Sequence, residues 1–238
     1  MTEQGIPYFL TDDLNYFPDA NLALKEPNGL LAIGGDLKPE RLLAAYRQGI
    51  FPWYDKEPIL WWSPDPRTIL LLNNLHISTS MKKVLHRHDF TITMDEQFTQ
   101  VIQNCATVRA ADPGTWITPQ MQAAYIELHE LGYAHSLEIC VNGSLVGGIY
   151  GVSLGKLFFG ESMFSLQPNA SKIAIIYLVK QLKAWDFEFI DCQMWSEHLG
   201  TLGATTVPRQ AFLQKLAQNN TIASKVGKWT FEGSLLSR

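Results

Sequence analysis

The chain has 238 residues, of which 46% are hydrophobic and 18% are charged, and its formal net charge is −4. This balance is typical of a globular protein that forms one large domain or two modest ones. The negative charge argues against a protein that coats nucleic acid non-specifically, because that mode of binding neutralises many phosphates at once.

No segment predicts export or membrane insertion. The N-terminus has no basic region leading into an apolar stretch, and the longest apolar run, Ile173 to Val179, is too short to span a bilayer. The three cysteines lie far apart, which fits reduced thiols better than a disulfide framework or a zinc site. We therefore expect a cytoplasmic protein.

The first predicted element is a short helix that begins at Pro39 and ends before Gly49. The next segment, residues 49–67, carries three of the seven tryptophans and four prolines. Because proline fixes φ and lacks an N–H donor, we expect neither a helix interior nor a central strand there. The rings of Trp53, Trp61 and Trp62 either offer a platform for a nucleobase or hold one domain against another, and residue type alone favours the second use.

An apolar strand is predicted over residues 67–72, directly after the Ser-Pro-Asp-Pro sequence. A domain boundary near residue 66 follows, with a small N-terminal domain (1–66) and a larger domain (67–238). In the larger part, helices are predicted at 78–87, 95–106, 118–131, 169–185 and 208–218, and strands at 136–141, 145–153, 157–162 and 187–193.

This element order is that of the acetyltransferase-like α/β (α+β) fold, in which helices flank a mixed, largely antiparallel sheet. Acyl-CoA-dependent members of that fold hold the pyrophosphate with a glycine-rich turn after the three-stranded meander. The corresponding stretch here, residues 165–171, has no glycine. We therefore expect no coenzyme A and no other cofactor.

Three polar residues are candidates for chemistry. Asp191 and Gln193 stand two apart on a predicted strand, so their side chains should share one face while Cys192 points to the other. Glu161 is a charged residue inside an apolar run, where it needs a partner or a function. Each of them could equally be a satisfied structural polar group.

Other catalytic constellations are not indicated. The histidines, including His86 and His88, lack companions at metal-ligand spacing, and the Gly-x-Ser-x-Gly motif is absent. We expect no metal and no covalent acyl-enzyme. Lys82, Lys83 and Arg87 form the only dense basic cluster, which is either a solvated helix face or a surface that contacts phosphates.

Six motifs occur in order along the chain: Glu26–Leu37, Gly49–Trp53, Leu60–Arg67, Gly114–Thr118, Gly160–Ser165 and Asp191–Gln193. With them the chain resembles the bacterial leucyl/phenylalanyl-tRNA–protein transferase family, from about residue 17 to the C-terminal helix. The resemblance implies an enzyme that moves Leu, and less readily Phe or Met, from aminoacyl-tRNA to proteins that begin with Arg or Lys. Such transfer tags the acceptor for the bacterial N-degron pathway. We expect this enzyme to be a monomer.

The resemblance also implies roles for single residues. Trp53 and Trp116 would hold the terminal adenosine of the tRNA, because bases stack on aromatic rings. The aminoacyl side chain would lie in a pocket formed by Ile149, Met163, Ile175, Leu178, Leu182 and Ile190. Ile149 stands where the family has Met, and Leu178 and Leu182 where it has aromatics, which leaves the balance between Leu and Phe donors open.

The reaction itself suggests how the polar residues act. An aminoacyl ester is already activated, so its aminolysis needs positioning and proton handling. Asp191 would orient Gln193, whose carbonyl accepts a hydrogen bond from the attacking amine, and Glu161 would hold the cationic acceptor terminus. Lys82, Lys83 and Arg87 would contact tRNA phosphates. The rival functions are an acyl-CoA N-acetyltransferase, a cell-wall aminoacyltransferase and a non-catalytic RNA-binding module.

Overall fold

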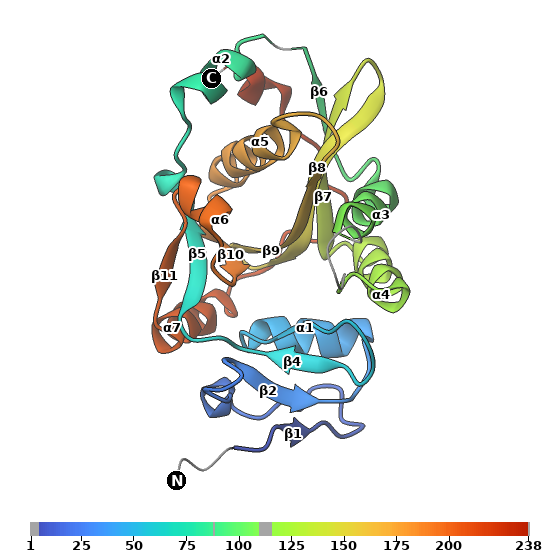
Figure 1. The fold of residues 1–238 in the computed structure, drawn as a ribbon, viewed down its shortest axis with the longest axis vertical. Coiled ribbons are helices and arrows are strands. Elements are labelled where there is room, and N and C mark those ends of the chain that lie inside the picture. Colours follow the sequence, from blue (N-terminus) through green and yellow to red (C-terminus); the bar gives the residue numbers. More distant parts are fainter. Residues whose placement is uncertain (1–4, 88, 110–115, 238) are drawn as a thin grey trace.

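Two β-sheets divide the chain in the computed structural model, which describes residues 5–87, 89–109 and 116–237. His88 and the first two residues of the Gly114–Thr118 motif lie outside the described residues. The smaller sheet has the strand order β1-β2-β4-β3, with β1 (Tyr8–Phe9), β2 (Leu30–Ile33), β3 (Phe51–Pro52) and β4 (Leu60–Trp62). Helix α1 (Pro39–Arg47) lies between this sheet and the rest of the molecule (Figure 1).

The larger sheet has the order β11-β5-β10-β9-β8-β7-β6. Its strands are β5 (Arg67–Leu71), β6 (Thr91–Met94), β7 (Ala134–Val141), β8 (Ser144–Leu154), β9 (Leu157–Ser165), β10 (Phe189–Gln193) and β11 (Thr205–Val207). Neighbouring strands run antiparallel except β9 and β10, which are parallel. The predicted α/β fold class with a mixed, largely antiparallel sheet is confirmed.

Helices cover both faces of the larger sheet. Helices α3 (Phe98–Arg109) and α4 (Pro119–Glu130) lie on one face and α5 (Ala170–Ala184) on the other (Figure 1). Most of α5 is buried, as its nearly continuous apolar sequence predicts. Shorter helices are α2 (Thr79–Leu85), α6 (Glu197–Thr201) and the C-terminal α7 (Arg209–Asn219). Among the described helices, none combines the length and apolar character needed to cross a membrane.

One predicted helix begins later than expected, and several short elements were not predicted. The helix predicted over 95–106 begins at Phe98, because residues 91–94 form β6, which pairs with β7. Asp95 then adopts φ 55°, a left-handed conformation that turns the chain between strand and helix. Strand β11 and helix α6 lie in segments for which no element was predicted, and both are short.

The expectation that residues 49–67 contain no central strand is wrong. Strand β4 pairs with β2 on one side and with β3 on the other. It contains no proline, while Pro52 lies in β3 at the sheet edge, where a missing N–H is tolerated. The side chain of Trp61 is wholly buried, donates from Nε1 to the Gly34 carbonyl at 2.8 Å, and packs edge-on against Phe17. Trp61 therefore belongs to the interior of the small sheet.

The two sheets share one apolar core. Trp61 and Tyr46 from the N-terminal part belong to the same cluster of buried side chains as Phe159 and Phe212. The smaller sheet ends at Trp62 and the larger begins at Arg67. The division of the chain into domains at residue 66 stays a prediction, since the packing between the two parts is continuous.

The C-terminal segment packs against the larger sheet. The indole of Trp229 stacks on the ring of His135 at 3.7 Å, and its backbone N–H donates to Asp95 Oδ2 at 2.7 Å. The same carboxylate accepts a hydrogen bond from His135 Nδ1 at 2.8 Å. These buried contacts fix residues that are far apart in sequence, so the last part of the chain is integral to the larger sheet.

Candidate active site

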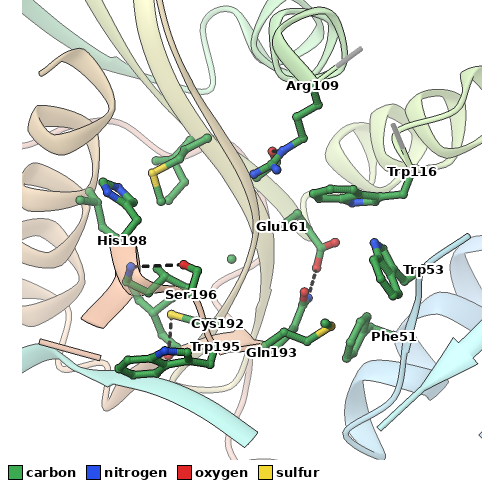
Figure 2. Close-up of a pocket in the computed structure, with 18 of the residues that line it drawn as sticks. Phe51, Trp53, Arg109, Trp116, Glu161, Cys192, Gln193, Trp195, Ser196 and His198 are labelled. Atoms are coloured by element: carbon green, nitrogen blue, oxygen red, sulfur yellow. Dashed lines mark hydrogen bonds between the residues drawn. The ribbon is translucent and has the colours of Figure 1, made fainter. Parts of the chain in front are cut away.

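A cavity of about 430 Å³ opens between the two sheets, where β3, β9, β10 and α6 meet (Figure 2). One end is aromatic, the middle is polar, and the remainder is largely apolar. Its lining is formed by Phe51, Pro52, Trp53, Arg109, Trp116, Ile149, Gly160, Glu161, Ser162, Met163, Ile175, Ile190, Cys192, Gln193, Met194, Trp195, Ser196, His198 and Leu199. Residues from four of the six sequence motifs therefore line one cavity.

Irregularities in two neighbouring strands direct polar side chains into the cavity. In β9, Ser162 pairs with Tyr150 and Gly160 with Gly151, which leaves Glu161 as an extra residue without a partner across the ladder. In β10, Cys192 is the extra residue in the pairing with β5. Such bulges re-aim side chains and are frequent beside active sites. The approach at the first bulge is close, since a Cβ on Gly151 would lie 2.1 Å from the Phe159 carbonyl oxygen.

The second bulge overturns the predicted arrangement of Asp191, Cys192 and Gln193. Cys192 and Gln193 both line the cavity, whereas Asp191 does not. Gln193 takes a left-handed φ of 62°, so the alternation of faces expected for a regular strand is lost. The expectation that Asp191 and Gln193 share a face is therefore wrong. Burial raises the pKa of the Cys192 thiol well above its ordinary value, so this thiol is not available as a thiolate.

Asp191 is fully buried and is held by Arg67. The Arg67 guanidinium donates from Nε to Oδ1 at 2.8 Å and from Nη2 to Oδ2 at 2.7 Å, which makes a bidentate ion pair. Oδ1 also accepts the backbone N–H of Gln193 at 3.0 Å. Through this bond the buried pair fixes the backbone from which the Gln193 side chain enters the cavity.

Glu161 accepts hydrogen bonds from neutral donors. Tyr46 Oη donates to Oε1 at 2.7 Å, and Tyr125 Oη donates to Oε2 at 3.1 Å. Gln193 Nε2 donates to Oε1 at 2.8 Å (Figure 2). The two tyrosine hydroxyls also contact each other. Burial raises the pKa of Glu161 from 4.5 to about 7, although the three hydrogen bonds oppose the shift. Burial likewise raises the pKa of both tyrosines, so their hydroxyls stay protonated as donors.

Trp53 and Trp116 lie at the aromatic end of the cavity (Figure 2). Their ring centroids are 6.3 Å apart with an interplanar angle of 69°. Trp62 supports this end from behind, because its Nε1 donates to the Trp53 carbonyl at 2.7 Å and its ring packs against Trp53. Both predicted stacking residues are only partly buried, which leaves ring surface open to a ligand.

The structure brings four of the six predicted pocket residues to the cavity. Ile149, Met163, Ile175 and Ile190 line it from β8, β9, α5 and β10. Leu178 and Leu182 do not, since they lie further along α5 and are buried in the core between this helix and the sheet. They belong to the same buried cluster as Ile149, Ile175 and Ile190, and their place in the aminoacyl pocket stays a prediction.

The basic cluster is separate from the cavity. Lys82 and Lys83 lie on α2 and Arg87 follows that helix; all three are exposed, and none lines the cavity. Within the described residues, no group of three His, Cys, Asp or Glu side chains is placed to hold a metal ion.

Several residues of the site were missed from the sequence. Tyr46 and Tyr125 come from α1 and α4, and Arg109 comes from the end of α3. Gln193 is followed directly by Met194 and Trp195, and His198 comes shortly after them. Closeness to Gln193 in the sequence was the one signal that pointed to these residues. Arg67 closes one of the six motifs, but its partner Asp191 is 124 residues away.

The chain matches the family described as leucyl/phenylalanyl-tRNA protein transferase over residues 69–217, and the N-terminal domain of that family over residues 35–65. A leucyl/phenylalanyl-tRNA–protein transferase from Stutzerimonas stutzeri is 55% identical over 209 residues, which cover 87% of this chain and 92% of the relative. One from Nitrosospira multiformis is 52% identical and covers 95% of this chain and 97% of the relative.

Similar solved structures are more distant. They include L-PGS from Bacillus licheniformis, at 12% identity and a TM-score of 0.39, with 83% of this chain and 66% of that chain covered. An aminoglycoside acetyltransferase from a soil metagenome has 12% identity and a TM-score of 0.36, with 47% and 82% covered. The extent and identity of the sequence matches decide the assignment: the chain belongs to the leucyl/phenylalanyl-tRNA–protein transferase family.

Proposed function

We propose that this protein is an aminoacyltransferase that moves Leu, and less readily Phe or Met, from aminoacyl-tRNA to the α-amino group of proteins that begin with Arg or Lys. The single observation that carries the proposal is the Glu161–Gln193 pair inside a cavity with an aromatic end and an apolar end. Family membership supports the same reaction class. The enzyme would act in the cytoplasm as a monomer and supply substrates to the N-degron pathway.

The two ends of the cavity suit the two ends of an aminoacyl-adenosine. The adenine would stack at Trp53 and Trp116, where each stacked base contributes about 1 to 3 kcal/mol. The aminoacyl side chain would enter the apolar part, beside Met163 and Ile175. The ester carbonyl then falls near the polar middle, where Gln193 and Glu161 lie. This placement needs no cofactor, because the ester supplies the activated acyl group.

Gln193 is oriented for the attacking amine. Its Nε2 donates to Glu161, which leaves its carbonyl Oε1 free to accept a hydrogen bond from the amine, and the Asp191–Arg67 pair fixes its backbone. The neutral amine nitrogen forms the new bond to the ester carbonyl carbon, the bond to the ribose oxygen breaks, and the amine proton ends on that oxygen. An α-amine with a pKa of about 8 is partly neutral near pH 7, so positioning is the main contribution.

Glu161 would hold the positive charge of the acceptor. As a carboxylate it can receive a charge-assisted hydrogen bond from the acceptor's ammonium group or from its Arg or Lys side chain. Its raised pKa makes it proton-bound in part of the population near pH 7, and an incoming cation favours the ionised form.

Lys82, Lys83 and Arg87 would contact phosphates of the tRNA body. They form an exposed basic cluster on a protein of net charge −4, and such a local surface can attract the acceptor stem. Charge reversal at Lys82 and Lys83 should weaken binding of Leu-tRNA and lower the slope of log affinity against log salt. An unchanged slope would contradict this role.

The central test incubates the protein with radiolabelled Leu-tRNA and a peptide that begins with Arg, and then with the same peptide beginning with Ala. Transfer to the first peptide alone supports the proposal, whereas binding of tRNA without transfer indicates the RNA-binding module. Gln193→Ala should reduce the single-turnover rate with bound Leu-tRNA roughly 100-fold. Near-wild-type rates for both Gln193→Ala and Asp191→Ala would refute the scheme.

A further inference from the structure

Arg109 places a fixed positive charge in the wall of the cavity. It is the last residue of α3, and its guanidinium lies 4.3 Å from the ring centre of Trp116. Its Nε donates to Ser162 Oγ at 3.0 Å. Figure 2 shows the side chain reaching into the cavity above Trp116. Two separate contacts therefore hold the guanidinium in one orientation.

No acidic side chain among the described residues pairs with Arg109. The described ion pairs include Arg67 with Asp191 and Arg41 with Asp36, but none that involves Arg109. Both terminal nitrogens of its guanidinium lack a hydrogen-bond acceptor among the described residues. It is also the only Lys or Arg in the described lining of the cavity. A partly buried guanidinium whose terminal nitrogens have no described acceptor, next to an aromatic ring, is suited to an anionic part of a ligand.

We propose that Arg109 binds the phosphate on the 5′ side of the terminal adenosine of aminoacyl-tRNA. This inference rests on the proposed function, because it takes the adenine to lie at Trp53 and Trp116. The 5′-phosphate is the anionic group attached to that nucleoside, while the adenine, the ribose and the ester are neutral. The guanidinium beside Trp116 presents two terminal nitrogens in a fork that matches two phosphate oxygens.

The contact with Ser162 gives this arrangement a further consequence. Ser162 lies in β9 directly after Glu161, so the residue that orients Arg109 adjoins the bulge that directs Glu161 into the cavity. A phosphate held by Arg109 and a carbonyl near Glu161 would thus be positioned by the same strand. Arg109 would set the depth to which the aminoacyl-adenosine end of the tRNA enters the cavity.

The test compares two stable analogues of the substrate end. One is 3′-leucylamido-3′-deoxyadenosine without a phosphate, and the other is the same nucleoside carrying a 5′-methylphosphate. Dissociation constants are measured by tryptophan fluorescence titration at fixed ionic strength. The wild-type protein should bind the phosphorylated analogue at least about tenfold more tightly, as expected for a charge-assisted hydrogen bond.

The variant Arg109→Gln should lose this advantage and bind the phosphorylated analogue only as well as the plain nucleoside. Arg109→Lys keeps the charge without the fork and should retain part of the advantage. Arg47→Gln serves as a matched control, since Arg47 is exposed and outside the cavity, and it should leave both affinities unchanged.

Two results would overturn the inference while leaving the proposed function intact. The wild-type protein could bind both analogues equally, or Arg109→Gln could weaken both by the same factor, which would assign Arg109 only to supporting Trp116. Failure of the wild-type protein to bind either analogue would instead contradict the placement of the aminoacyl-adenosine itself, and the inference with it.

Discussion

Asp191 and Glu161 are carboxylates on neighbouring parallel strands, yet their surroundings differ. Asp191 is fully buried and faces a guanidinium that pairs with both of its oxygens. Glu161 opens to the cavity and receives hydrogen bonds from two hydroxyls and one amide, all neutral. One carboxylate has its charge matched inside the protein, and the other is hydrogen-bonded without a matching charge.

This difference indicates a structural role for Asp191 and a chemical role for Glu161. A buried ion pair holds its geometry because either member alone would be an uncompensated charge. A carboxylate held by neutral donors can still respond to a charged ligand. Burial without a charged partner raises the pKa of Glu161, so a bound cation can shift its protonation. Gln193 joins the two, through its backbone to Asp191 and through its side chain to Glu161.

The largest effect is expected from breaking the ion pair. Arg67→Met leaves Asp191 buried without its partner and should lower the free energy of unfolding by about 3 to 5 kcal/mol, measured by urea denaturation. The double variant Arg67→Met/Asp191→Leu should recover much of this loss, because it removes both charges. Exposed Arg47→Met is the control. A loss below about 1 kcal/mol in the single variant would show that Asp191 needs no charged partner.

Removal of one neutral donor should have an intermediate effect. Tyr46→Phe deletes the 2.7 Å hydrogen bond to Glu161 and should cost about 1.5 to 3 kcal/mol of stability at pH 8, where the carboxylate is mostly ionised. It should also raise the pKa of Glu161, since this bond lowers it. Tyr125→Phe deletes the longer contact of 3.1 Å and should cost less. An equal loss of stability in the two variants would contradict the expectation that the shorter hydrogen bond contributes more.

Measured per pH unit, the smallest effect is a pH dependence specific to Glu161. Its pKa is raised in the folded state, so its contribution to stability is fully present below pH 4.5 and is lost as the pH rises through about 7. Between these values, wild-type stability should fall with pH more steeply than that of Glu161→Gln, by up to about 1.4 kcal/mol per pH unit. Parallel curves from urea denaturation at each pH would contradict the raised pKa.

Much of the fold could be predicted because local signals agreed with the final structure. The Asn142-Gly143 turn between apolar runs marks the hairpin of β7 and β8, and Pro119 marks the start of α4. Strand β4 was missed because prolines at 58 and 64 flank a segment of only three strand residues. Its place in the sheet depends on pairing with β2, which the local sequence does not encode.

The site was less accessible to sequence reasoning because its geometry depends on two bulges. Period-two alternation places Asp191 and Gln193 together, and only the pairing of β10 with β5 shows that Cys192 is an extra residue. The environment of Glu161 depends on Tyr46, which is 115 residues away, so its raised pKa has no local signature. Leu178 and Leu182 are buried further along α5 and are not among the residues that line the cavity, so their role in the pocket stays a prediction.

The position of Trp229 bears on when the larger sheet completes its packing during folding. Its indole covers His135, and its backbone N–H donates to Asp95, so these two buried groups lack a contact until Trp229 is in place. The larger sheet can therefore finish packing only once Trp229 has docked, and a chain without this residue would leave one face of the sheet open.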